Sequence, residues 1–195
     1  MMRVEARPNV FFGGIFDESF NYVIPHERSS VPPPPPVSCK ERRAWAWQHD
    51  GADAGETWAE MTLASNRSAE VTIADLHVEI VKKTPLSVGF IAECTTGGAD
   101  PDKEQGLQID LDSPTPKIGF ISDYGGAIKE VPRWKLGPGT QDTFNLLARV
   151  RRGFLVEWRL VATVISDGKT EQLIVDDRGA PFRTAGATLP SYSDD

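Results

Sequence analysis

The residues with the clearest chemical potential are two aspartates, Asp110 and Asp112, which alternate with Ile109 and Leu111. This alternation predicts a strand, on which both carboxylates point to one face about 7 Å apart. Two such carboxylates can carry out glycoside hydrolysis when they flank a cleft. The solvent-facing side of an ordinary surface strand has the same pattern, and we take that as the simpler interpretation.

A second acidic group, Asp100, Asp102 and Glu104, resembles the opening of a calcium loop, where alternate oxygen ligands converge on one cation. The turn glycine, Gly106, comes one position late, and Leu111 occupies the position that needs a bidentate glutamate. We therefore expect a solvated loop, with calcium as the weaker alternative. No cofactor is predicted.

The other residues that often carry catalysis show no supporting motif. His26, His49 and His77 share no ligand spacing, and His77 is expected to face solvent from a strand. The sequence has no Gly-x-Ser-x-Gly nucleophile elbow and no glycine-rich phosphate loop. These observations favour a protein that is not an enzyme, with a carbohydrate-active hydrolase that uses the 100–112 region as the alternative.

Three tryptophans are candidate binding residues. Trp45 and Trp47 alternate around Ala46, so an extended segment would place both rings on one face. Such a pair can stack on a sugar or a peptide, although a lid over the end of the core explains it equally well. Trp134 is expected to anchor the irregular stretch 123–139.

The chain has two cysteines, Cys39 and Cys94, which are too few for a zinc site or a disulfide-dense fold. They could form one disulfide in an oxidising compartment, or remain separate thiols in a reducing one. The residues alone leave both alternatives open.

Residues 154–182 are expected to position the rest of the chain as a long hairpin. Asp167 and Gly168 suit a type I′ turn, because both tolerate positive φ. Pairing Ser166 with Lys169 then places Ala162 opposite Leu173, and Leu160 opposite Val175. The same register predicts two charge pairs on the other face, Arg159 with Asp176 and Glu157 with Arg178.

Alternating apolar residues predict further strands over 57–64, 71–82, 107–111 and 144–150. A further candidate strand covers 87–94, and a short one covers 117–122. No amphipathic helix is evident. We therefore expect an all-β protein, an antiparallel immunoglobulin-like β-sandwich of about seven to nine strands with an irregular N-terminal segment.

The expected organisation has four parts: an extended segment over 1–30, a proline-rich strut with the tryptophans over 31–56, the sandwich over 57–184, and a flexible tail over 185–195. Five consecutive prolines from Pro32 to Pro36 predict a polyproline II stretch. It could dock on an aromatic groove of another protein, but we favour a strut packed on the domain.

The composition limits the partners. With 195 residues and a formal charge of −7, the chain is long enough for one core and is acidic, which argues against a nucleic-acid partner. No apolar stretch is long enough to span a membrane, and the start lacks the apolar region of a signal peptide.

Several stretches together carry a family resemblance. They are Tyr22-Val23-Ile24, Val31 with the five prolines, Cys39 before the tryptophans, Gly55-Glu56-Thr57, Leu76 to Val81, Ile109 to Asp112, Val156-Glu157-Trp158 and Val175 to Thr184. Over most of residues 20–186, the chain resembles an uncharacterised family of actinobacterial β-sandwich proteins. Members are often membrane-anchored, and some are labelled transcriptional regulators because of an upstream helix-turn-helix region.

The resemblance implies a domain outside the membrane, at the cell envelope, whereas the chain as written would be cytoplasmic. It also favours a disulfide between Cys39 and Cys94, because similar proteins have cysteines at matching places. The family supplies no catalytic residues. We therefore expect a non-enzymatic interaction or sensor module with a protein or glycan partner; an intracellular subunit of a larger assembly is a further alternative.

Overall fold

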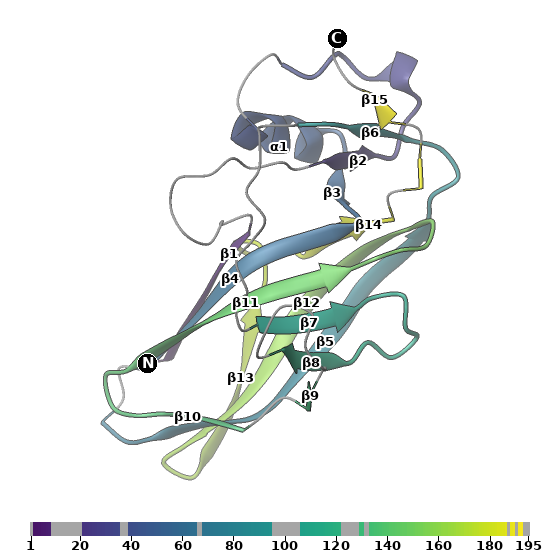
Figure 1. Ribbon diagram of the computed structural model, residues 1–195. Coiled ribbons are helices and arrows are strands. Elements are labelled where there is room, and N and C mark those ends of the chain that lie inside the picture. Colours follow the sequence, from purple (N-terminus) through teal and green to yellow (C-terminus); the bar gives the residue numbers. More distant parts are fainter. Residues whose placement is uncertain are drawn as a thin grey trace.

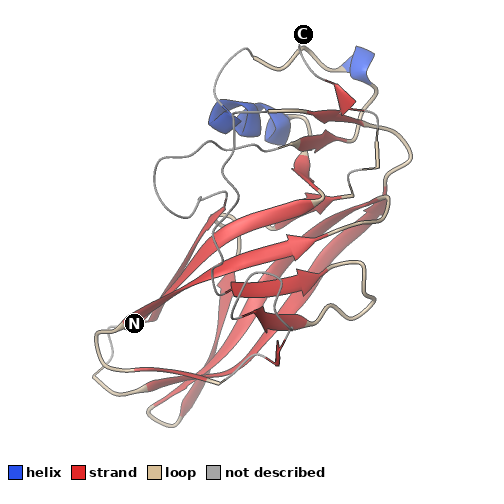
Figure 2. Cartoon of the chain, in the orientation of Figure 1, coloured by secondary structure: helices blue, strands red, loops and turns tan. Residues whose placement is uncertain are grey.

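The computed structural model of the protein describes residues 2–8, 21–35, 39–65, 68–94, 106–121, 129–130, 133–186, 188–189 and 191–192. For 2–8, 39–40, 121, 129–130 and 191–192 only the backbone is described. Strands dominate these residues (Figure 2). The all-β class expected from the alternating residues is therefore confirmed.

The strands form two sheets. The six-stranded sheet A has the order β1 (Met2–Pro8), β4 (Glu56–Ser65), β11 (Gln141–Arg149), β7 (Gly106–Asp110), β8 (Ile118–Ile121), β9 (Lys129–Glu130). The nine-stranded sheet B has the order β10 (Trp134–Leu136), β5 (Val71–Pro85), β12 (Phe154–Ser166), β14 (Phe182–Ala185), β3 (Ala52–Ala54), β2 (Tyr22–Ile24), β6 (Phe90–Ala92), β15 (Ser191–Tyr192), with β13 (Lys169–Val175) also paired to β12.

The main core lies between the two sheets. Met61 and Leu146 reach it from sheet A, and Trp158 and Leu160 from sheet B, all at most 1% exposed. The strand alternation predicted from the sequence produces this arrangement, since every second residue of β4 is buried. Both sheets are mixed, because β7 runs parallel to β11, β3 to β14 and β6 to β15. The pairing is therefore not antiparallel throughout.

The long strand β12 is central to sheet B and forms the predicted hairpin with β13. Ser166 pairs with Lys169, and Leu160 with Val175, which is the register expected from the turn. Asp167 and Gly168 have φ values of 52° and 69°, as a type I′ turn requires. The hairpin turn and its register are confirmed.

Beyond Val175 the hairpin ends. The predicted pair of Glu157 with Arg178 is wrong, whereas Asp176 does act on Arg159 through its charge, although Arg159 donates its side-chain hydrogen bonds to another strand. The chain makes a tight turn through Arg178 and Gly179, both at positive φ, and β14 takes over as the neighbour of β12. Arg159 donates two hydrogen bonds to Glu79 of β5, at 3.1 and 3.0 Å. Glu157 stands opposite Arg183 rather than Arg178, because the turn shifts the register.

The structure also has an α-helix that the sequence analysis did not predict, α1 (Cys39–Gln48). Its residues are good helix formers, but its apolar side chains form no continuous stripe. The helix ends where Asp50 adopts a φ of 57° and the N–H of Gly51 reaches the Ala46 carbonyl at 2.8 Å. A Cβ at position 51 would lie 2.6 Å from that oxygen, so only glycine fits there.

We call the group formed by α1, β2, β3, β6 and β15 the cap. Figure 1 shows it at one end of the sandwich, joined to it where β14 runs beside β3. Two small apolar clusters hold it: one under α1 with Tyr22 and Trp45, and one where Val23 meets Leu155 of β12. A short 3₁₀ helix, η1 (Arg28–Ser30), precedes the proline stretch. Residues 32–35 of that stretch lie outside helices and strands, with Pro34 buried, and Pro36 is beyond the described part.

Candidate functional site

The two aspartates expected to act as an acidic pair both accept hydrogen bonds from backbone N–H groups. The carboxylate of Asp110 accepts the N–H of Asp112 at 3.0 Å. The carboxylate of Asp112 accepts the N–H groups of Arg151 and Arg152 at 2.9 and 3.2 Å. These bonds fasten the end of β7 to the turn before β12, which is a structural task.

The three candidate tryptophans do not come together. Trp45 is 7% exposed and packs in the cap, and Trp134 contacts Phe144 at the edge of the main core, with ring centroids 4.6 Å apart. Residues two apart on a helix point about 200° apart, so Trp45 and Trp47 do not share a face. The segment is helical rather than extended, so the condition under which both rings would share one face is not met.

Other expected ligands are dispersed or lie outside the described chain. Asp100, Asp102 and Glu104 fall in the stretch 95–105, outside the described residues. Among the residues that are described, no three His, Cys, Asp or Glu side chains gather in a way that could hold a metal ion. Within the same residues, no helix has the length and apolar character needed to cross a bilayer.

Cys94 is disulfide-bonded. Cys39, the other cysteine of the chain, is the first residue of α1, and its side chain lies outside the described part. His77 is exposed on β5 and contacts Asp75 at 2.7 Å. The expectation that His77 faces solvent is confirmed.

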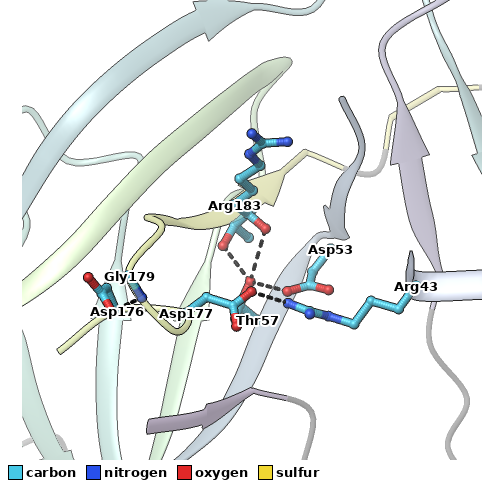
Figure 3. Close-up of polar contacts among 8 residues, drawn as sticks. Arg43, Asp53, Thr57, Asp176, Asp177, Gly179 and Arg183 are labelled. Carbon is cyan, nitrogen blue, oxygen red and sulfur yellow. Dashed lines mark hydrogen bonds and ion pairs between the residues drawn. The ribbon is translucent and has the colours of Figure 1, made fainter. Parts of the chain in front are cut away.

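A partly buried ion pair fastens the cap to the sandwich. Arg43 of α1 reaches Asp177, in the turn after β13, with a distance of 2.8 Å between the guanidinium and the carboxylate (Figure 3). The side chains are 19% and 8% exposed. The same guanidinium lies over the Trp47 ring, 3.9 Å from its centroid. Arg43 is thereby held against both α1 and the sandwich.

A cleft lies between the cap and the outer face of sheet B. Its volume is about 370 Å³. Its walls come from the segment after β2, the end of α1 and the β5–β6 connection, and its floor from β5, β12 and β14. The lining residues are Pro25, His26, Asp50, Lys82, Thr84, Pro85, Leu86, Ser87, Val88, Leu155, Glu157 and Arg183.

The floor of this cleft carries a row of three charges. Glu157 of β12 stands opposite Lys82 of β5 on one side and opposite Arg183 of β14 on the other. Its neighbours Val156 and Trp158 are buried in the main core, so Glu157 points to the opposite face, into the cleft. We call Lys82, Glu157 and Arg183 the charged row.

A β-bulge in β5 places Lys82 in this row. Ile80 pairs with Trp158. Glu157, the residue before Trp158 in β12, pairs with Lys82, so Val81 has no partner on β12. Without this extra residue, Val81 would face Glu157 and Lys82 would face Val156. Bulges commonly redirect a side chain in this way, often beside functional sites.

The charged row has no ion pair with any residue in the described part of the chain. Neither Lys82, Glu157 nor the Arg183 guanidinium makes a side-chain hydrogen bond or ion pair with another described residue. The adjacent charges on the same strands are different, because Arg159 and Glu79 bind each other through two hydrogen bonds. The side chains on the cleft floor are therefore available to a ligand.

A second concavity, of about 350 Å³, is lined by Gly55, Glu56, Arg149, Val150, Arg151 and Thr188. Two of its charges already bind each other, since Arg149 donates to Glu56 at 2.6 Å. The cleft with the charged row is therefore the better candidate site.

Sequence reasoning missed the charged row because it assigned Glu157 to Arg178. The segment Asp177–Pro181, with its glycine and proline, signals a turn that could have ended the hairpin earlier. The bulge at Val81 leaves no such signal. Comparisons with protein-family models, with curated protein sequences and with solved structures found no match.

Proposed function

We propose that this protein is a non-enzymatic β-sandwich interaction module that binds its partner in the cleft beneath the cap. The charged row carries the proposal, because it places three charges in a concavity where none of the described residues pairs with them. Charged side chains usually gain from pairing where a site is partly desolvated. A bulge that turns Lys82 into the cleft supports binding as the purpose of the arrangement.

The hydrogen bonds of the two candidate catalytic aspartates favour a binding role over catalysis. Asp110 and Asp112 already accept backbone hydrogen bonds, and neither lines the cleft. A location at the cell envelope also belongs to the proposal. The disulfide at Cys94 supports it, because structural disulfides persist in oxidising compartments.

A steric block tests where the partner binds without assuming its chemistry. Ser87 is exposed and lines the cleft, so Ser87→Trp fills it, whereas Thr170→Trp adds the same ring at the far end of the hairpin. We expect ligands that wild type selects from peptide and glycan arrays to lose binding to Ser87→Trp and to keep binding to Thr170→Trp. Ligands that bind all three proteins equally would contradict the cleft as the binding site.

A hydrolysis assay tests the absence of catalysis. Wild type and an Asp110→Ala, Asp112→Ala double variant are incubated with the glycans found on the array. We expect no turnover by either protein. Turnover by wild type that the double variant loses would refute the non-enzymatic assignment.

A further inference from the structure

We infer that the cleft takes an extended acidic peptide from a protein partner, with one carboxylate bound to Lys82 and a second bound to Arg183. This inference rests on the proposed function and specifies its ligand. It is drawn from the sign of the charges, their spacing and the other lining residues.

The charges in the cleft favour an anionic ligand. The charged row has two cations and one anion, so it is locally positive on a chain with a formal charge of −7. The remaining groups of the lining, His26 and Asp50, lie 3.5 Å apart in the cap wall, and with His26 neutral the whole lining has two cations and two anions. The preference for an anion therefore belongs to the floor, where Lys82 and Arg183 flank the single carboxylate of Glu157. At physiological salt, charges within about 8 Å act most strongly, so a ligand on the floor is governed by these groups rather than by the overall negative charge.

The spacing of the cations favours two separate carboxylates over one compact anion. Lys82 and Arg183 flank Glu157 on neighbouring strands, so their backbones are about 9.6 Å apart, or two strand spacings. A phosphate placed between them would lie against the Glu157 carboxylate and be repelled. A peptide in the polyproline II conformation repeats every three residues, or about 9.3 Å, so glutamates at positions i and i+3 match the two cations.

The remaining lining favours a peptide over an acidic glycan. Sugar rings usually stack on aromatic side chains, but the described residues that line the cleft include no Trp, Tyr or Phe. The rim instead offers aliphatic surface, with Val88 44% exposed. Glu157 lies between the cations and can accept an N–H from the peptide backbone. Arg183 can bind a carboxylate through two parallel hydrogen bonds.

The test uses the full, oxidised chain and a fluorescein-labelled peptide with glutamates at positions i and i+3. The controls are the same peptide with both glutamates replaced by glutamine and a uronic-acid oligosaccharide. Fluorescence anisotropy gives the affinity, and amide chemical shifts locate the bound peptide. We expect the glutamate peptide to bind and to shift the amides of residues 82–88, 155–157 and 183, and the glutamine peptide to bind at least about tenfold more weakly.

Substitutions test each contact. Lys82→Ala and Arg183→Gln should each weaken binding about tenfold, because each removes a charged hydrogen-bond partner. Lys169→Ala is the matched control, since Lys169 is an exposed cation at the opposite end of the hairpin. Lys82→Glu should restore affinity for a peptide with lysine at the first of the two positions. This reversal would not occur if the variants merely disturbed folding.

The outcomes separate the two proposals. Failure of the glutamate peptide to bind, equal binding of the glutamine peptide, or tighter binding of the uronic-acid oligosaccharide would overturn the acidic-peptide inference. The proposed function would survive each of these results if Ser87→Trp still abolished binding of ligands selected from the arrays. Array ligands unaffected by Ser87→Trp would instead overturn both proposals.

Discussion

At the level of single residues, the junction of the cap and the sandwich contains a chain of three hydrogen bonds in which the donor of each bond can be assigned. The Trp158 indole N–H donates to the Thr184 hydroxyl at 2.9 Å, and an indole cannot accept in return. Thr184 and Thr57 share a hydroxyl bond of 2.6 Å, and Thr57 donates to the buried Asp53 carboxylate at 2.8 Å. Each hydroxyl has one hydrogen, so Thr184 donates to Thr57. The chain therefore runs from Trp158 to Asp53.

Thr184→Val tests this chain. Valine has nearly the same shape but leaves the buried Trp158 N–H without its acceptor and Thr57 without a donor. We expect a loss of roughly 2–3 kcal/mol in the free energy of unfolding, measured by urea denaturation. Thr170→Val, on exposed β13, should change the stability little. An unchanged unfolding midpoint for Thr184→Val would show that the chain contributes nothing.

The pair Arg159–Glu79 on the outer face of sheet B gives a prediction about pH. The side-chain hydrogen bond from Arg159 lowers the pKa of Glu79 below its ordinary value, and its positive charge adds to this effect. Because the pKa is lower in the folded state, the pair stabilises the fold above the unfolded-state pKa of Glu79. That contribution is lost as the pH falls through the lowered value.

We expect carbon-detected NMR titration to give Glu79 a pKa below the ordinary glutamate value in the wild-type protein. Arg159→Gln should raise it back toward that value. His77→Gln should raise it less, because the His77 charge is the smallest of the causes that lower it. A Glu79 pKa that Arg159→Gln leaves unchanged would refute the proposed cause.

At the level of elements, the sequence predicted what local periodicity and turn chemistry determine. The turn at Asp167 and Gly168 set the β12–β13 register, and alternation identified the buried side chains of β4. Helix α1 was missed because it covers only a small cluster and therefore needs no long apolar stripe. The charged row was missed because it depends on β14 replacing β13 beside β12, a tertiary choice without local periodicity.

The disulfide is a prediction about how α1 is attached. Cys94 follows β6, and Cys39 begins α1, so a bridge between them would tie the start of the helix to the cap sheet. We expect alkylation without reduction, followed by peptide mapping, to find Cys39 and Cys94 in one linked peptide. Cys94→Ser should lower the stability by roughly 2–4 kcal/mol. Two alkylated thiols in protein purified under oxidising conditions would contradict the bridge.

At the level of the whole molecule, the sandwich and the cap differ in how much apolar surface holds them. The main core draws residues from both sheets, whereas the two clusters of the cap are small. We therefore expect the partly buried pair of Arg43 and Asp177 to help hold α1 against the sandwich. Regions with few buried apolar contacts open at a lower free energy than the global one.

This difference predicts local opening of the cap. Removing one partner of this partly buried ion pair leaves the other charge unpaired, at a cost of up to about 3 kcal/mol. Asp177→Ala should therefore increase hydrogen exchange in α1 and β2, while β4 and β11 stay protected. A double variant that also carries Arg43→Ala should be less destabilised than the sum of the single variants, because neither charge is then left alone.

Asp177→Ala also tests whether the cap contributes to binding in the cleft. Asp177 does not line the cleft, but His26 and Asp50 of the cap form one of its walls. Loosening the cap should therefore weaken binding of the acidic peptide even though Lys82, Glu157 and Arg183 are intact. Hydrogen exchange and anisotropy on Asp177→Ala measure the two effects together. Equal exchange increases in β2 of the cap and in β4 and β11 of the sandwich would show that the cap and the sandwich open as one unit. An unchanged affinity would show that the cap wall does not contribute to binding.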